Sequence, residues 1–119
     1  MSIMSLLKTN SPDYDAIDAV TTQTNLLVAT DTKERQAAIK KLRIGALVDL
    51  KRTRQNGHVV YVVSDLKTGK VIGEISYGTS EYLDQNYRNY KMLGKVTEIG
   101  RITPGGRGLQ VNVVYKVYL

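Results

Sequence analysis

The strongest constraint on the fold is the dipeptide Asn56-Gly57, which lies between two runs of apolar and β-branched residues. Asparagine and glycine both accept the positive φ values of a type I′ turn, so this pattern predicts a tight β-hairpin. The strands of the hairpin are predicted at Leu47–Thr53 and His58–Ser64. The hairpin therefore begins an antiparallel meander.

A second turn and a helix follow the hairpin. Gly69 takes the left-handed position of the turn, which predicts a third strand at Val71–Tyr77. Thr79 or Ser80 can cap a helix that runs to about Lys91. One face of this helix carries large side chains at spacings of four and three residues: Leu83, Tyr87 and Tyr90.

Two more strands complete the predicted sheet. The first covers Lys95–Ile102 and leads into a loop, residues 103–108, whose proline and glycines exclude regular structure. The last strand, Leu109–Leu119, has the clearest period of two in the chain. Its apolar face is predicted to be buried: Leu109, Val111, Val113, Tyr115, Val117 and Leu119.

Three strands, a helix and two strands form the element order of an oligonucleotide-binding (OB) barrel. We therefore expect a mainly β protein with helices (α+β). Its expected architecture is a five-stranded OB-fold barrel with the helix between strands 3 and 4, preceded by an N-terminal strand-helix extension. The β-face and long loops of such barrels commonly hold single-stranded nucleic acid.

The residues before the barrel are predicted as an extension of the same domain, because 119 residues is close to the common size of one domain. A strand is predicted at Thr24–Thr30, and a helix that starts at Asp31 or Thr32 ends near Leu42. The single domain, residues 1–119, is thus expected to consist of an N-terminal arm (1–23), a strand-helix extension (24–44) and the barrel (45–119).

Composition excludes several classes of function. The chain has no cysteine, which excludes disulfides, thiolate metal sites and thiol nucleophiles, and His58 is its one histidine. No apolar run approaches the roughly 18 residues of a membrane span, and the N-terminus lacks the pattern of a secretory signal. We expect a cytoplasmic protein, in the host cytoplasm if a phage encodes it, without a bound metal or cofactor.

Signatures of enzymes are absent from the sequence. No phosphate-cradling loop with its Lys-Ser/Thr pair occurs, and the glycines of residues 105–108 lack the spacing of a dinucleotide site. The carboxylates of the barrel are scattered and are interpreted as surface groups: Asp49, Asp65, Glu74, Glu81, Asp84 and Glu98. Asp84 and Arg88, four residues apart in the helix, are expected to form a weak ion pair. We therefore expect a protein that is not an enzyme.

The distribution of charge indicates a polyanionic partner. Residues 1–32 carry one cation and four anions, whereas residues 33–119 carry sixteen cations and seven anions. A basic body favours polyanions, and for a small domain the usual polyanion is nucleic acid. An anionic membrane is the alternative, but proteins of membrane surfaces usually carry a basic amphipathic helix with Trp, Phe or Leu, and this chain has no Trp or Phe. We expect no membrane partner.

The hairpin carries the densest group of candidate nucleic-acid ligands. Lys51, Arg52 and Arg54 lie on and beyond the end of its first strand, and Asn56 and His58 add neutral hydrogen-bonding groups. Cations together with neutral polar groups suit phosphates and splayed base edges. The alternative interpretation is a solvated hairpin tip without a ligand.

A second basic group flanks the loop between the last two strands, where the sequence has Arg101 and Arg107. In an OB barrel this loop faces the same cleft as the first hairpin, so the two groups are expected to converge. A groove for a polyanion needs cations along a track rather than at one spot. The two groups together form the predicted binding groove.

Tyrosine accounts for all Phe, Trp and Tyr content of the chain. A phenol ring can stack on a base for about 1 to 3 kcal/mol, whichever base it is. Tyr77, at the end of the third strand, and Tyr118, opposite the apolar face of the last strand, are predicted as exposed stacking platforms. Tyr61 could point either way, because both faces of its strand are apolar, whereas Tyr115 is expected in the core.

Three short runs resemble the HIRAN module, a modified OB barrel that captures DNA ends. The runs are Gly45–Arg52, Tyr61–Val63 and Gly69–Ile75, and the resemblance covers about residues 24–119. Where that module usually has an Asn-Pro-Tyr-Asp stretch, this chain has Asn56-Gly57-His58-Val59. The Tyr and Asp that engage a strand end there are missing from these positions, so the resemblance does not by itself imply end recognition.

The size, single-domain form and element order also resemble small phage single-stranded DNA-binding proteins of the lactococcal-phage type. Such proteins coat single-stranded DNA without sequence preference, often as oligomers, and support replication or recombination. The resemblance implies a homo-oligomer that binds single-stranded DNA in DNA replication or recombination, with phage or host replication and recombination proteins as partners. Two alternatives remain: a phage protein that binds and inhibits a host nucleic-acid enzyme, and a HIRAN-like DNA-end binder.

Overall fold

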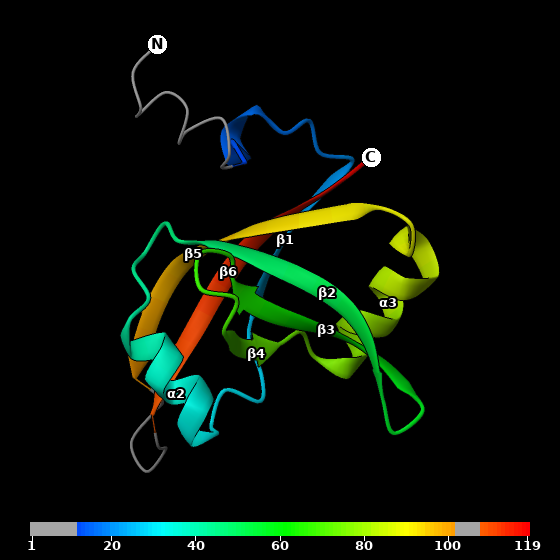
Figure 1. Ribbon diagram of the computed structural model, residues 1–119. Helices are drawn as coiled ribbons and strands as arrows, with labels where there is room; N and C mark the ends of the chain where they lie inside the picture. The colour runs from blue at the N-terminus through cyan, green and yellow to red at the C-terminus, as the bar shows by residue number, and fades with distance from the viewer. Residues whose placement is uncertain (1–11, 102–107) are drawn as a thin grey trace.

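The computed structural model describes residues 12–101 and 108–119, and Figure 1 shows their arrangement. The protein is mainly β: a six-stranded antiparallel sheet is accompanied by two helices and one 3₁₀ turn. The elements in chain order are η1 (Tyr14–Ala16), β1 (Thr21–Leu26), α2 (Lys33–Lys40), β2 (Leu47–Gln55), β3 (His58–Asp65), β4 (Val71–Glu74), α3 (Tyr77–Tyr87), β5 (Lys91–Arg101) and β6 (Leu109–Tyr118). Neighbouring strands in the sheet follow the order β1-β6-β5-β2-β3-β4.

The two ends of the sheet are connected by the short segment that follows β1. Leu27 donates its N–H to the carbonyl of Val111 in β6 (2.9 Å), and Val28 exchanges two backbone hydrogen bonds of 2.9 Å with Glu74 in β4. Residues 27–28 therefore lie between β6 and β4, which are not hydrogen-bonded neighbours in the part of the chain that is described. The sheet thus has six strands rather than five, and β1 is part of it rather than an extension.

The N-terminal strand begins and ends earlier than the predicted Thr24–Thr30, because its pairing with β6 covers Thr21–Leu26. Asn25 of β1 accepts a 2.7 Å hydrogen bond from the Tyr115 hydroxyl of β6. After β1 the backbone at Ala29 has a φ of 54°, which interrupts extended structure before Thr30. The apolar run that predicted the strand therefore lies partly outside it.

The other predicted elements occur in the expected order, with different bounds around α3. The third strand, β4, ends at Glu74 rather than at Tyr77, and the N-cap of α3 is Ser76 instead of the predicted Thr79 or Ser80, so that the helix begins at Tyr77. Ser76 precedes the helix with extended backbone, and its hydroxyl lies 3.2 Å from that of Thr79. The following strand, β5, starts at Lys91, where the helix was expected to end.

The core lies on one face of the sheet and is shared by both helices. Leu83 of α3 and Ile39 of α2 pack against this core with at most 1% of their surface exposed. The two helices lie on opposite sides of the molecule in Figure 1. The predicted apolar face of the last strand is confirmed as buried at Val111, Val113, Tyr115 and Val117. The opposite face of the sheet, which we call the outer face, carries the polar side chains that alternate with the core residues.

Candidate nucleic-acid interface

The hairpin between β2 and β3 has the predicted two-residue turn. Gln55 and His58 are register partners, and φ is 52° at Asn56 and 81° at Gly57. These values belong to a type I′ turn, whose twist matches that of the flanking strands. The hairpin projects beyond the rest of the sheet in Figure 1, and Arg54 is exposed near its tip.

Successive residues of β2 point to opposite faces of the sheet. Leu50 lies in the core, whereas Lys51 and Thr53 lie on the outer face. A shallow groove of about 480 Å³, which we call the sheet groove, runs across this face. Its lining comes from three neighbouring strands and includes Asp49, Lys51, Thr53, Val62, Ser64 and Val71.

Two of the predicted cations are available to a ligand. Lys51 and Arg54 are both exposed, and neither forms an ion pair with a carboxylate of the described residues. A phosphate could therefore approach either side chain without displacing an existing partner. Lys51 borders the sheet groove directly.

Arg52, the third cation of the hairpin, is engaged within the protein. Its Nε lies 2.6 Å from Oδ1 of Asp84 on α3, and Nε of Arg88 lies 3.0 Å from the same oxygen. The hydrogen bonds from Arg88 and Arg52 lower the pKa of Asp84 from 3.8 to about 2. The predicted ion pair of Asp84 and Arg88 is confirmed, and Arg52 joins it, so that Arg52 ties β2 to α3 instead of standing free.

His58 and Tyr77 come together beside the hairpin although they lie on different elements. Their ring centroids are 5.5 Å apart, with 36° between the ring planes. Tyr77 is 56% exposed, in the first turn of α3 rather than at the end of the third strand. The two rings form a surface on which an unstacked base could lie.

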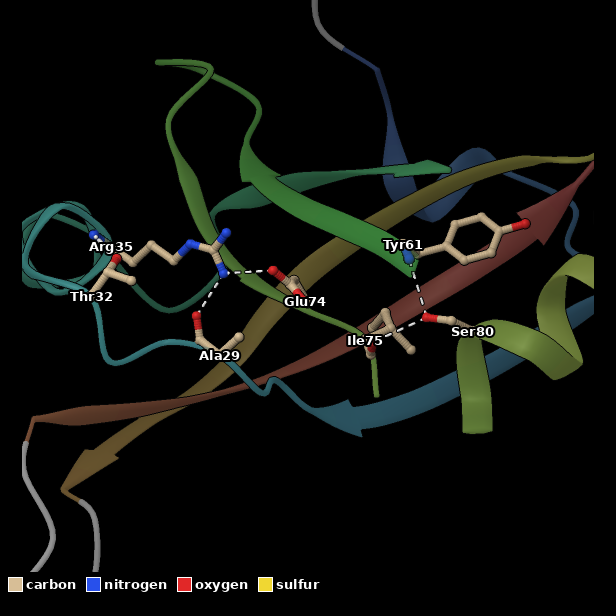
Figure 2. Close-up of polar contacts among 7 residues, drawn as sticks. All are labelled: Ala29, Thr32, Arg35, Tyr61, Glu74, Ile75 and Ser80. Atoms are coloured by element: carbon tan, nitrogen blue, oxygen red, sulfur yellow. Dashed lines mark hydrogen bonds and ion pairs between the residues drawn. The ribbon is translucent and has the colours of Figure 1, made fainter. Parts of the chain in front are cut away.

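Tyr61, whose orientation the sequence left open, belongs to the core and is therefore not available as a nucleic-acid ligand. Only 3% of it is exposed, and Figure 2 shows its backbone next to Ser80 of α3. The Tyr61 N–H donates to Ser80 Oγ (3.1 Å), and the Ser80 hydroxyl donates to the carbonyl of Ile75 (3.0 Å). These bonds hold α3 against β3, and burial raises the pKa of the Tyr61 phenol above 10.0.

Tyr118 lies on the outer face, opposite the core face of β6, as predicted, but it is half-buried rather than exposed. It is the register partner of Lys91, the exposed first residue of β5. Asp49 of β2 and Leu93 of β5 are register partners and point to the same face. Lys51 lies two residues after Asp49, and Lys91 lies two residues before Leu93. The side chains of Lys51, Lys91 and Tyr118 therefore share the outer face. Lys91 was not predicted as a ligand, because the sequence placed it at the end of a helix.

Arg101 lies far from the hairpin, so the expected convergence of two basic groups is not found. β2 and β5 are antiparallel, with Leu47 opposite Lys95. From this pair β2 runs toward the hairpin, while β5 runs in the other direction to Arg101, so the two ends separate. Figure 1 shows them at opposite ends of the sheet, and Arg107 lies outside the described residues.

Comparisons with protein-family models, with curated proteins and with solved structures find no match for this chain. In the described residues, no helix has the length and apolar character needed to cross a membrane. Those residues also contain no cluster of three or more His, Asp or Glu side chains that could hold a metal ion. The candidate interface therefore has to be assessed from its own geometry.

Proposed function

We propose that this protein is a non-enzymatic single-stranded DNA-binding protein that binds without sequence preference. The observation that carries the proposal is the outer face of β2 and β3. There Lys51 borders a shallow groove, and the exposed ring pair of His58 and Tyr77 lies beside the same hairpin. Cations for the phosphates and flat rings for the bases are what a sequence-tolerant single-strand site requires.

The order of the elements supports the proposal. Three strands, a helix and two strands follow one another from β2 to β6, as in an OB barrel. We infer that the fold is an OB-type barrel in which residues 27–28 lie between β4 and β6, the third and fifth strands of the barrel. In a closed barrel these two strands would pair directly. The sheet groove then corresponds to the β-face that OB proteins use for oligonucleotides.

A single strand suits this surface better than a duplex does. Stacking on His58 and Tyr77 requires a base that is free of its neighbours, and a duplex keeps its bases stacked. The functional setting that follows is the protection of exposed strands during DNA replication or recombination, by a homo-oligomer in the cytoplasm.

The first experiment compares poly(dT), duplex DNA and single-stranded RNA of equal length at moderate salt. Preference for poly(dT) is expected. Replacement of the free cation of the outer face, Lys51→Ala, should weaken binding and reduce the slope of log K against log salt concentration by about 0.7, the value for one phosphate contact on a single strand. Arg101→Ala is the matched control, because Arg101 is an exposed cation at the opposite end of the sheet.

The stacking part of the proposal has its own control on α3. Tyr77→Leu should lower affinity for poly(dT) by roughly 5- to 150-fold, the equivalent of about 1 to 3 kcal/mol per stacked base. Tyr82→Leu should not, although Tyr82 is also exposed (46%) and on the same helix. Absence of binding to any of the three nucleic acids would contradict the proposed function.

A further inference from the structure

Four exposed cations surround the turn between β3 and β4, at the far side of the sheet groove from the hairpin. Lys67 and Lys70 belong to the turn, and Lys41 and Arg43 follow α2. We call these four residues the turn patch. No carboxylate of the described residues forms an ion pair with any of them.

Two further shallow grooves connect the turn patch with the sheet groove. One, of about 580 Å³, is lined in part by Lys41, Arg43 and Lys67, and the other, of about 640 Å³, by Lys41 and Lys70. The sheet groove shares Leu66 with the first of them and Val71 with the second. The three grooves are therefore adjacent, and together they lead from Lys51 to the end of α2.

Two carboxylates, Asp65 and Glu34, line these two grooves, and the turn engages Asp65. Asp65 Oδ1 accepts a hydrogen bond from the Lys67 N–H (3.2 Å), and Oδ2 accepts one from the Thr68 hydroxyl (3.0 Å). The Asp65 carbonyl also accepts the N–H of Gly69 (2.8 Å), whose φ is 75°. Asp65 therefore shapes the turn that displays the two lysines, whose ammonium groups form no ion pair with the residues that the structure describes.

The position of α2 beside the turn is fixed by an ion pair and by close backbone packing. Arg35 Nη1 donates to Glu74 Oε2 (2.8 Å) and to the carbonyl of Ala29 (2.7 Å), as Figure 2 shows. The chain before α2 passes so close to β4 that a Cβ on Gly73 would lie 3.0 Å from Thr30 Cγ2. The cations of α2 and of the turn are thus held near one another before any ligand binds, which lowers the cost of binding.

We propose that a strand bound in the sheet groove continues over the β3–β4 turn onto the turn patch, which binds its phosphates. This inference rests on the proposed function and gives the path of the DNA. The path leads from the hairpin over the β3–β4 turn to the C-terminal end of α2. No aromatic side chain lines the two grooves of the patch, so its contacts are with the phosphates and are independent of sequence.

The test uses oligo(dT) of two lengths and two double variants, Lys67→Ala with Lys70→Ala and Lys41→Ala with Arg43→Ala. Lengths of about 4 and about 16 nucleotides span the site sizes of OB folds. Both variants should bind the short oligomer like the wild type, because the hairpin face holds it. They should bind the long oligomer more weakly. The slope of log K against log salt concentration should decrease in magnitude by about 1.4 for two lost phosphate contacts.

Arg88→Ala, which removes an exposed cation at the end of α3, away from the turn patch, is the matched control and should bind both oligomers like the wild type. Circular dichroism and thermal melting of each variant establish that it is folded. If the wild type binds neither oligomer, the proposed function itself fails. If the wild type binds both and the two double variants bind the long oligomer with unchanged affinity and salt dependence, the path over the turn patch is wrong and the proposed function stands.

Discussion

At the scale of single residues, the arginines and lysines of the hairpin differ in what they contact. Arg52 lies 2.6 Å from Asp84, whereas Lys51 and Arg54 have no carboxylate partner in the described residues. Sequence alone treats these three neighbours alike, because the carboxylate that separates them lies 32 positions away on α3. A count of cations in a hairpin therefore overestimates the number available to phosphates.

The ion cluster of Asp84 predicts a pH dependence of stability. The folded-state pKa of about 2 lies below the ordinary value of 3.8, so the charged carboxylate stabilises the fold above pH 3.8, and this contribution is lost as pH falls toward 2. Asp84→Asn should therefore lower Tm at pH 6, and the difference from the wild type should shrink between pH 3.8 and 2. Melting curves followed by circular dichroism across this range provide the measurement.

Glu81→Gln serves as the control for Asp84→Asn, since Glu81 lies on the same helix, is exposed and forms no ion pair in the described part of the chain. Its Tm should follow that of the wild type at every pH. A difference between Asp84→Asn and the wild type that stays constant down to pH 2 would contradict the assignment.

Tyr61 and Tyr115 show what local pattern can and cannot predict about a side chain. The last strand alternates apolar and mostly polar residues, so the burial of Tyr115 followed from its period of two. Both faces of β3 are apolar, and the orientation of Tyr61 depends on α3, which reaches it through Ser80. The direction of the Tyr61 side chain could therefore not be predicted from the pattern of its own strand.

At the scale of elements, features set by adjacent residues were predicted well, and those set by distant residues were not. The turn at Asn56-Gly57 and the Thr32 cap of α2, whose Oγ1 accepts the Arg35 N–H (3.2 Å), have the expected geometry. The bounds of β1 were wrong, because pairing with β6 and the positive φ of Ala29 override its apolar run. Strand length here depends on the partner strand.

The pairing of β2 with β5 predicts a strict need for glycine at position 94. A Cβ there would lie 2.8 Å from Val48 Cγ2 and 3.2 Å from Tyr115 Cβ, both fully buried. Because a packed core cannot yield that space freely, Gly94→Ala should reduce the free energy of unfolding by about 1 to 3 kcal/mol. Urea denaturation measures this change.

Gly100→Ala, in the same strand, is the matched substitution for Gly94→Ala. The nearest neighbour of its Cβ would be Glu98 Oε1 at 4.0 Å, so it should change the free energy of unfolding by no more than about 0.5 kcal/mol. Equal effects of the two substitutions would contradict the close packing described for β2 and β5.

At the scale of the whole molecule, topology decides which basic groups can act together. The sequence contains the cations of the turn patch in two separate runs, and only the folding of α2 beside β4 brings them next to one another. The same topology separates the hairpin from Arg101, because antiparallel strands carry their ends apart. The binding path inferred here is therefore a property of the sheet rather than of any one motif.

The proposed function requires that single-stranded DNA binds to the outer face of β2 and β3. Amide chemical shifts of the ¹⁵N-labelled protein, recorded during titration with an oligo(dT) of about 16 nucleotides, test it most directly. The largest shifts are expected around Lys51, Thr53, His58 and Val62, while the amides of β1 should remain unchanged. Shifts confined to β1 and the end of β5 near Arg101, or no shifts at all, would contradict it.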